Sequence, residues 1–388
     1  MKARLTERQA LQRDPSARSG EHAISVASAA EPCLTFAGQA GDEGSHRIGR
    51  SFCRGRWRVS ACPALRVSLL LAALALTFWL SLFCWSPIAI GPGQALAALL
   101  PGPPAGIAQA LVFNLRLPRS LVAMLLGASL ALAGALLQTL TRNPLASPSL
   151  LGINAGAALA MVLATAFNPA WVAGYSIALL AAVGGGISWG LVMLLGRGWQ
   201  QAGDRSRLIL AGVAVSALCA ALTRATLLLA EDHAYGVLHW LAGGVSSVRW
   251  REFWQLLPFT LLLAPLACLL AGRLNLLRLG DDGASTLGIH PGRLRLLINL
   301  LVVLLVGSCV SVAGPLAFLG LLVPHMARAL FGHDLRRLLP AALLLGALLM
   351  LLADLLARGL AFPGELPAGA VLALVGAPFF VWLVRRRT

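Results

Sequence analysis

Lysine is almost missing from this chain, which has one lysine, Lys2, among its 388 residues. A nucleotide-binding P-loop needs a lysine beside its glycine-rich turn to reach the β and γ phosphates. The polypeptide therefore does not hydrolyse ATP by that route. Its seven histidines are scattered and offer no Ser-His-Asp or Cys-His arrangement, so we expect a chain that is not an enzyme.

Charged residues are also scarce, at 12% of the sequence against 58% hydrophobic residues, and the mean hydropathy is +0.79. A soluble globular protein carries roughly twice that charged fraction, so the composition predicts a polytopic membrane protein. Asp354 is the only acidic residue well inside an apolar segment. Carriers driven by a proton or sodium gradient usually bury several carboxylates near mid-membrane. The energy source is therefore expected to lie outside this chain.

Metal and nucleic-acid patterns are missing too. The seven cysteines show no CxxC spacing, and four of them fall inside or beside apolar runs, which favours neither a disulfide framework nor a zinc site. We expect no metal and no cofactor in this chain. The net charge of +16 comes from arginines between apolar runs rather than from a basic face with interleaved aromatics. We therefore expect no nucleic-acid partner.

Long uncharged stretches dominate what remains, and they predict an all-α fold. Since about 20 apolar residues cross a bilayer, these stretches give ten transmembrane helices. The predicted limits are 67–86, 118–140, 148–167, 173–195, 208–230, 253–272, 295–313, 316–331, 339–360 and 367–384. The helix at 316–331 is short and contains Pro324, which argues against a full crossing.

The distribution of arginines predicts the orientation of these helices. With the N-terminus inside, the inner loops and the C-terminal tail hold 14 arginines and the outer loops hold five. Inner loops of membrane proteins are enriched in Lys and Arg, so both termini are expected in the cytoplasm.

Residues 1–66 differ from the rest, with 11 Lys/Arg, six Asp/Glu and no sustained apolar period. We expect this N-terminal extension to be disordered, ahead of a ten-helix domain at 67–388. A wrongly assigned translation start is the alternative, although no methionine lies between Met1 and Met124 to mark a later one.

One segment, 116–158, is the most informative about function. Arg116 and Arg119 flank a proline at its start, and an uncharged run then ends in a turn at Arg142, Asn143 and Pro144. Small residues within that run, Gly127 and Gly134 among them, would let neighbouring helices approach closely. A simple membrane anchor needs none of this pattern.

Four blocks in order resemble the FecCD-type permease family, the membrane subunits of ATP-binding-cassette importers for iron-siderophores, haem and vitamin B12. The blocks are 116–158, RLILAGVAVSAL at 207–218, LNLLRLGDDGASTLGIHPGRLR at 274–295, and 314–387. The resemblance covers about residues 67–388 and leaves out the N-terminal extension.

The resemblance implies a type II ABC importer permease, with about ten transmembrane helices per subunit and a translocation path along a dimer axis. It implies as partners a second permease subunit, in a homodimer or a heterodimer, and two ATPase subunits that carry ATP-Mg. It also implies a periplasmic substrate-binding protein and a location in the bacterial inner membrane, within the lipid bilayer.

Three arginines match outward-facing arginines that pair with acidic residues of the binding protein in the family. They are Arg116, Arg119 and Arg358. A charge pair at a rim fixes register more than it adds affinity. The alternative is that these arginines cap helix ends and extend to lipid headgroups. Asp354 and Arg358 are four residues apart and can also pair on one helix face.

Residues 280–290 match the cytoplasmic segment that docks in a cleft of the ATPase. The resemblance implies short helices, joined by Gly283 and Gly288, that act as a lever. The residues predicted to couple to the ATPase are Gly280, Asp281, Asp282, Gly283, Ala284, Ser285, Leu287 and Gly288. Ser285 departs from the family, where an arginine often follows the alanine. An ordinary solvated loop is the alternative.

Asn143 and Leu145 match the turn that narrows the inner end of the path in the family. Arg205 and Ser206 are placed opposite them by a looser match, and the large arginine departs from the small polar residues found at this position. An Asn-Pro pair is also a plain turn former, so the turn has a purely structural alternative.

The leading functional prediction is a permease subunit that imports a ferric-siderophore-type chelate. Import of haem or vitamin B12 by the same machinery is the alternative. A non-transporting membrane receptor or scaffold and a self-powered carrier are the competing classes. A receptor would stimulate no ATPase, and a self-powered carrier would depend on a proton gradient.

Overall fold

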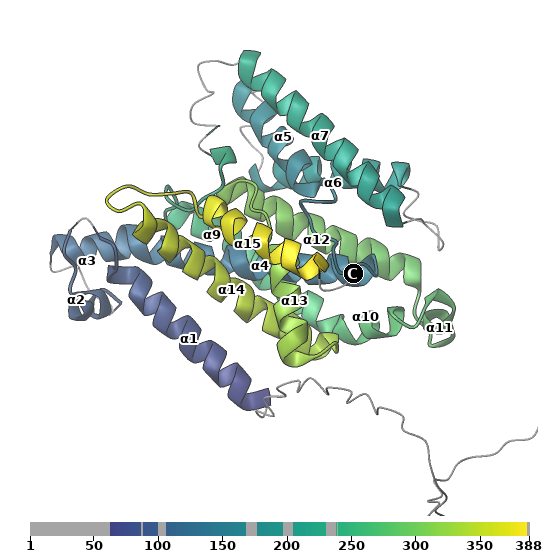
Figure 1. Ribbon diagram of the computed structural model, residues 1–388, viewed down its shortest axis with the longest axis horizontal. Coiled ribbons are helices and arrows are strands. Elements are labelled where there is room, and N and C mark those ends of the chain that lie inside the picture. The colour runs from purple at the N-terminus through teal and green to yellow at the C-terminus, as the bar shows by residue number, and fades with distance from the viewer. Residues whose placement is uncertain are drawn as a thin grey trace, which may run out of the picture. The chain divides into compact units, whose positions relative to one another are not determined.

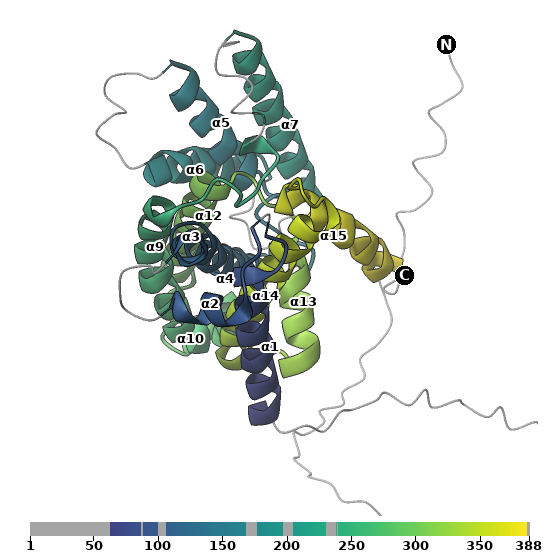
Figure 2. The same cartoon turned by 90° about the vertical axis from the view of Figure 1, so that its left-hand side faces the viewer.

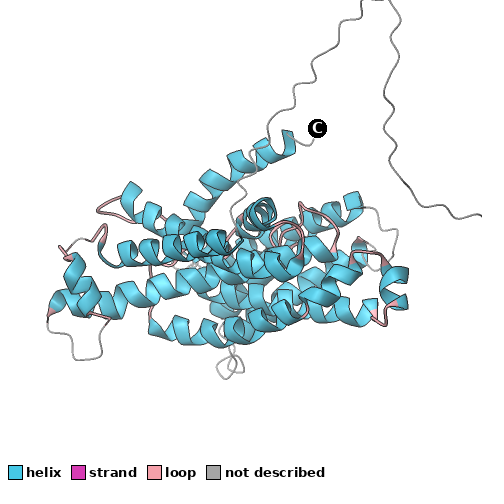
Figure 3. Ribbon diagram, turned by 90° about the horizontal axis from the view of Figure 1, so that it is seen from below, coloured by secondary structure: helices cyan, strands magenta, loops and turns pink. Residues whose placement is uncertain are grey.

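The computed structural model describes residues 63–86, 88–99, 106–167, 177–196, 205–229, 238 and 240–385 (Figure 1). Every regular element within those ranges is a helix, and the helices are joined by loops and turns (Figure 3). Nearly all of the N-terminal extension predicted at 1–66 lies outside the described residues.

The main helices are α1 (Pro63–Phe83), α4 (Leu117–Leu140), α5 (Ile153–Phe167), α6 (Ile177–Leu195), α7 (Arg205–Leu229), α9 (Trp250–Leu269), α12 (Pro291–Ala313), α13 (Leu319–Phe331), α14 (Leu335–Leu360) and α15 (Ala368–Arg385). Short helices are α2 (Pro92–Ala97), α3 (Ile107–Leu111), α10 (Ala271–Leu277) and α11 (Asp281–Thr286), and η1 (Val112–Arg116) is a π-helical turn.

These main helices match the ten predicted segments one for one. Within the described ranges, seven helices are long and apolar enough to cross a membrane, and α5, α13 and α15 contribute shorter apolar stretches. The 13 residues of α13 rise only about 20 Å, less than a hydrocarbon core of about 30 Å. The prediction of an all-α multi-pass membrane protein is confirmed.

Helix α4 lies in the middle of the helices that contact it, which are α1, α9, α12, α13 and α14 (Figure 2). Glycines allow the close approach. A Cβ atom on Gly127 would lie 2.1 Å from the carbonyl oxygen of Gly346 in α14, and one on Gly134 would lie 2.0 Å from that of Gly320 in α13. The sequence-based expectation for these two glycines is confirmed.

The helical segment that contains α4 begins earlier than predicted. Helices α3, η1 and α4 run on without a break from Ile107 to Leu140, whereas the sequence favoured a start at 118. Arg116 and Pro118 looked like a boundary. Both are buried instead, because the guanidinium finds its hydrogen-bond acceptors inside the protein.

A second packing group consists of α5, α6 and α7, with α6 also against α12 (Figure 1). Here again glycine permits backbone contact. A Cβ atom on Gly156 in α5 would lie 2.5 Å from the carbonyl oxygen of Gly184 in α6. Small residues therefore hold these helices at short distance, as is usual where lipid supplies no hydrophobic drive to association.

Candidate functional site

Apart from Arg205 and Ser206, which begin α7, the candidate functional residues lie near the two ends of α4. Arg116 and Arg119 stand at its start, and the turn at Arg142 follows its last residue, Leu140. A helix of 24 residues is about 36 Å long. We call the two regions the Asp354 end and the Asp281 end, after the carboxylate at the centre of each.

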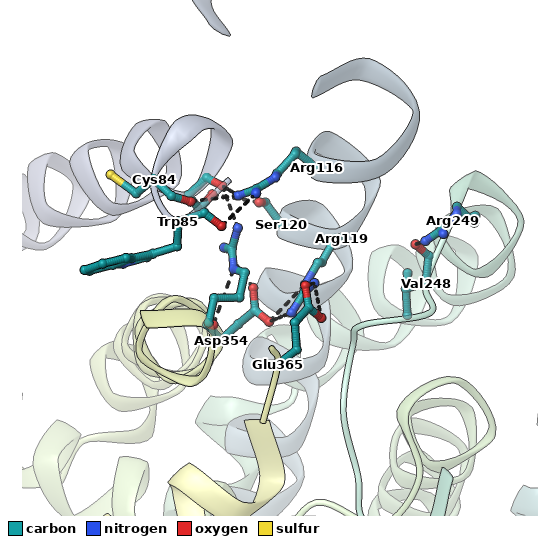
Figure 4. A network of polar contacts seen from close by, with 11 residues as sticks. Cys84, Trp85, Arg116, Arg119, Ser120, Val248, Arg249, Asp354 and Glu365 are labelled. Carbon is teal, nitrogen blue, oxygen red and sulfur yellow. Dashed lines mark hydrogen bonds and ion pairs between the residues drawn. The ribbon is translucent and has the colours of Figure 1, made fainter. Parts of the chain in front are cut away.

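At the Asp354 end, Arg119 bonds to two carboxylates (Figure 4). Its Nε and Nη2 donate to Asp354 Oδ1 at 3.0 and 2.8 Å, and its Nη1 donates to both carboxylate oxygens of Glu365 at 2.9 Å. Asp354 lies on α14 and Glu365 in the loop after it. Arg119 therefore ties α4 to both.

Arg116, labelled in Figure 4, and Arg358 complete the cluster. Arg358 forms an ion pair of 3.0 Å with Asp354 Oδ2, as the spacing of four predicted, and its Nη1 donates to the Ser81 carbonyl at 2.9 Å. Arg116 donates to the carbonyls of Cys84 and Trp85 at 2.8 and 3.0 Å. The last carbonyls of a helix have no partner within it. Arg358 satisfies the Ser81 carbonyl in the last turn of α1, and Arg116 satisfies two carbonyls just after the helix ends at Phe83.

Burial separates the members of this cluster. Arg116, Arg119 and Arg358 are 8%, 7% and 2% exposed and Asp354 is fully buried, whereas the Glu365 side chain is 43% exposed. Burying a charge without a partner is costly. Arg119 and Arg358 form ion pairs with Asp354, and Arg116 is satisfied by backbone carbonyls. Glu365 is the member of the cluster that solvent reaches most easily. The docking role of the three arginines stays a prediction.

Aromatic side chains gather at the same end. The Phe113 and Trp250 rings lie 5.4 Å apart, Trp250 and Phe253 also 5.4 Å, and Trp85 and Phe362 6.3 Å. The Trp250 Nε1 donates to the Phe113 carbonyl at 3.1 Å. Tryptophan with one polar edge is enriched at the bilayer–water interface, so we expect the Asp354 end to lie near such an interface.

At the other end, α11 carries the predicted ATPase-coupling residues. Gly280 and Gly288 flank it with φ of +114° and +77°, a region that glycine enters without steric cost. Gly283 lies inside α11 rather than at a joint, so the N-terminal hinge of the segment is Gly280. Ala284 is buried, while Asp282, Ser285, Leu287 and Gly288 are exposed.

Asp281 links α11 to two distant parts of the chain. Its Oδ1 accepts hydrogen bonds from Arg295 Nη2 on α12 at 2.7 Å and from Arg142 Nη2 at 3.3 Å. The same Arg142 nitrogen donates to the Leu277 carbonyl at the end of α10, at 3.0 Å. The structure thus brings the coupling segment and the turn after α4 together, and no local pattern in the sequence indicates this contact.

The inner turn itself is stabilised locally. Asn143 Oδ1 accepts a hydrogen bond from the Leu145 backbone at 3.0 Å, which is an Asx turn. Arg205 and Ser206 begin α7, and their side chains lie outside the described residues. A constriction between the two pairs therefore stays a prediction.

A cavity of about 380 Å³ opens at the Asp281 end. Its lining includes the side chains of Arg142, Arg278, Arg328 and His333, with Gln138 and Thr139 from the last turns of α4. Arg278 donates to the His333 carbonyl at 2.7 Å and Arg328 donates to Gln138. Positive charge therefore surrounds the space beside the inner turn.

Comparison with known proteins gives concordant results. A sequence model of the FecCD transport family matches residues 73–386. The Fe(3+) dicitrate transport system permease protein FecC of Escherichia coli (strain K12) is 64% identical over 325 residues, covering 84% of this chain and 98% of FecC. FecD, the permease protein of that name from the same system and strain, is 42% identical over 271 residues, 70% of this chain and 84% of FecD.

A solved structure agrees in fold. The inward-facing conformation of a metal-chelate type ABC transporter superposes with a TM-score of 0.69 and 31% identity, covering 83% of this chain and 99% of that one. The likeness therefore extends over most of the helices described above.

Proposed function

The chain belongs to the FecCD transport family, and we propose that it is the permease subunit that admits a ferric citrate or similar ferric-siderophore chelate. The observation that carries this proposal is 64% identity over 98% of FecC, a permease of a Fe(3+) dicitrate system. The aligned stretch covers 84% of this chain. Orientation with both termini in the cytoplasm belongs to the same proposal.

A separate ATPase is proposed to dock on α11. Leu279 and Leu287 are 68% and 56% exposed on either side of this short helix. Exposed leucines on a segment rich in charge are typical of a protein contact, since an interface buries apolar side chains inside a polar rim. The nucleotide and its magnesium ion would sit in that partner.

A substrate-binding protein is proposed to dock at the Asp354 end. There Arg119 is held by the half-exposed Glu365, and the exposed Arg249 and Arg251 lie near the aromatic cluster. A carboxylate of the partner would compete with Glu365 for Arg119. We expect Glu365→Gln to strengthen this association more than Glu252→Gln does, as measured by surface plasmon resonance; equal effects would contradict a local competition.

The second permease subunit is proposed to be a different chain. FecC and FecD are named as two permease proteins of one system, and this chain is 64% identical to the first and 42% identical to the second. We expect this chain to purify as a stable transporter only when a FecD-like subunit is co-expressed.

The test is uptake into proteoliposomes that hold this chain with its candidate second permease and ATPase, with ATP inside. Binding protein and radiolabelled ferric citrate are supplied outside, with haem and vitamin B12 as competitors. Uptake that requires every component and ATP supports the proposal. ATPase binding without ferric citrate uptake would overturn the substrate class, and uptake driven by a proton gradient without ATP would overturn the importer.

A further inference from the structure

The carboxylate of Asp281 joins three elements at its end of the molecule. Its Oδ1 bonds to Arg295 on α12 and to Arg142 in the turn after α4. The side chain is 13% exposed. Since α11 is six residues long and begins at Asp281 itself, these two ion pairs fix the start of the helix against the rest of the bundle.

Arg142 is held at both its side chain and its backbone. Its φ is +49°, a left-handed conformation that costs an ordinary residue about 1–2 kcal/mol. Such a conformation persists where the surrounding structure enforces it, and here the guanidinium bonds to the Leu277 carbonyl and to Asp281. The turn therefore keeps its shape through α10 and α11.

The two bonds of Asp281 differ. The contact with Arg295 is 2.7 Å and joins residues 14 apart, whereas the contact with Arg142 is 3.3 Å and joins residues 139 apart. The Arg142 side chain is 43% exposed and that of Arg295 is 25% exposed. The shorter bond, with Arg295, anchors α11 to α12. The longer bond, with the more solvent-exposed Arg142, is the one that a movement of α11 would stretch first.

We propose that Asp281 is a positioning residue of the transport cycle, which makes the turn at 142–145 follow the movement of α11 through its ion pair with Arg142. This inference rests on the proposed function, because it takes an ATPase as the source of that movement. Displacement of α11 pulls on Arg142, and the left-handed backbone of Arg142 passes the displacement directly to Asn143 and Leu145. Asp281 thus acts through Arg142 and touches no substrate.

The first test is the number of ferric citrate molecules imported per ATP hydrolysed by the complete reconstituted complex. Asp281→Asn removes both ion pairs. Arg142→Gln keeps the pair between Asp281 and Arg295 and removes the Arg142 bonds to Asp281 and to the Leu277 carbonyl. Arg293→Gln is the matched control, since Arg293 is exposed on the same helix as Arg295 and makes no contact with Asp281. We expect the ratio to fall about fivefold or more in the first two variants, the lower range for coupling between sites.

The second test follows the turn directly. In the complete complex, Leu145→Cys is alkylated by a charged maleimide with and without ATP, against the same complex without this cysteine as background. We expect ATP to change the rate when Asp281 is present, no ATP dependence with Asp281→Asn, and partial return with Asp281→Glu. A variant whose fold alone has changed would alter the alkylation rates with and without ATP, but the rates would still differ between the two conditions.

The outcomes separate the two proposals. An unchanged import ratio in both Asp281→Asn and Arg142→Gln, with ATP-dependent labelling retained, overturns the inference while leaving the transporter intact. A parent complex that neither imports ferric citrate nor hydrolyses ATP overturns the proposed function and the inference with it. Should Asp281→Asn fail to assemble, Arg142→Gln decides, because it keeps the anchor between Asp281 and Arg295.

Discussion

Arg119 shows how one buried charge is stabilised within an apolar protein. It has two carboxylate partners, of which Asp354 is fully buried and Glu365 is half-exposed. The stabilisation by an ion pair depends on what the partners would meet without it. Removing a buried partner leaves an uncompensated charge, which costs about 3–5 kcal/mol, whereas exposed pairs contribute about 0–1 kcal/mol.

We expect Asp354→Asn to destabilise the protein by about 3–5 kcal/mol, because Arg119 and Arg358 both lose a buried carboxylate. Glu365→Gln should cost about 1 kcal/mol or less, since water replaces the half-exposed partner. The two variants are compared in detergent by the temperature at which each loses its monodisperse size-exclusion peak. Equal losses would mean that burial does not set the strength of these pairs.

Asp334 makes the start of α14 sensitive to pH. Its carboxylate accepts hydrogen bonds from the Arg336 backbone at 3.0 Å and from Asn275, and these bonds hold its pKa below the usual value. A carboxyl group with a depressed pKa stabilises the fold above its unfolded pKa, near about 4. That contribution is lost as pH falls through the folded pKa.

We therefore expect the first turn of α14 to loosen below about pH 4. Amide hydrogen exchange at Arg336, compared between the parent and Asp334→Asn across pH, measures this directly. The variant keeps a capping oxygen without the charge, so the ratio of the two rates should vary with pH. A constant ratio would contradict a titrating cap.

At the scale of helices, glycine determines how closely α4 meets its neighbours. Gly127 and Gly134 face the backbone carbonyls of Gly346 and Gly320, so no side chain intervenes at either crossing. A Cβ atom on Gly190 in α6 would meet no atom within 4 Å, and this glycine provides the contrast within the same protein.

We expect Gly127→Ala to lower stability by about 1–3 kcal/mol or more, because its methyl group would overlap the Gly346 carbonyl. Gly190→Ala should be neutral or slightly stabilising, since it only restricts the unfolded chain. The yield of folded protein from membranes and its thermal stability in detergent test the pair. Equal effects of the two substitutions would contradict the role of the close contact between Gly127 and Gly346.

Gly288 tests the joint that follows α11. An alanine there meets no atom within 4 Å but must adopt a φ of +77°, at a cost of about 1–2 kcal/mol. We expect Gly288→Ala to shift the local equilibrium of the segment about 5- to 30-fold and to weaken ATPase stimulation. Gly292→Ala, also in open space but within α12, should couple normally; loss of coupling in both would point to crowding instead.

The helices could be predicted from the sequence because their apolar runs are local, and 118–140 differs from α4 by one residue at its start. The continuation back to Ile107 could not be predicted, since Arg116 looks like a boundary until its acceptors just after α1 are known. The coupling segment was placed by family resemblance. Its bond to Arg142 joins residues 139 apart. Hydrophobic periodicity predicts only local structure, so it could not indicate this contact.

For the whole molecule, the functional residues divide between two ends separated by the length of α4. Aromatic rings gather at the Asp354 end beside the exposed Arg249 and Arg251, while the Asp281 end carries more exposed arginines, Arg293 and Arg337 among them. That asymmetry fits the enrichment of arginine in cytoplasmic loops.

We expect Arg251→Cys to react with a membrane-impermeant maleimide added outside intact cells, and Arg293→Cys to react only after the membrane is opened. Both positions are exposed, so accessibility from one side decides the result. The reverse pattern would place the Asp281 end outside and contradict the proposed orientation.

The partners of Arg119 lie 235 and 246 residues further along the chain, and this separation has a consequence for biogenesis. At about 5–20 residues per second, roughly 10 to 50 s pass between synthesis of α4 and synthesis of its first carboxylate partner. During that interval α4 waits in the insertion machinery or the bilayer with an uncompensated charge. A chain that stops before α14 therefore leaves Arg119 without its buried carboxylate partner, Asp354.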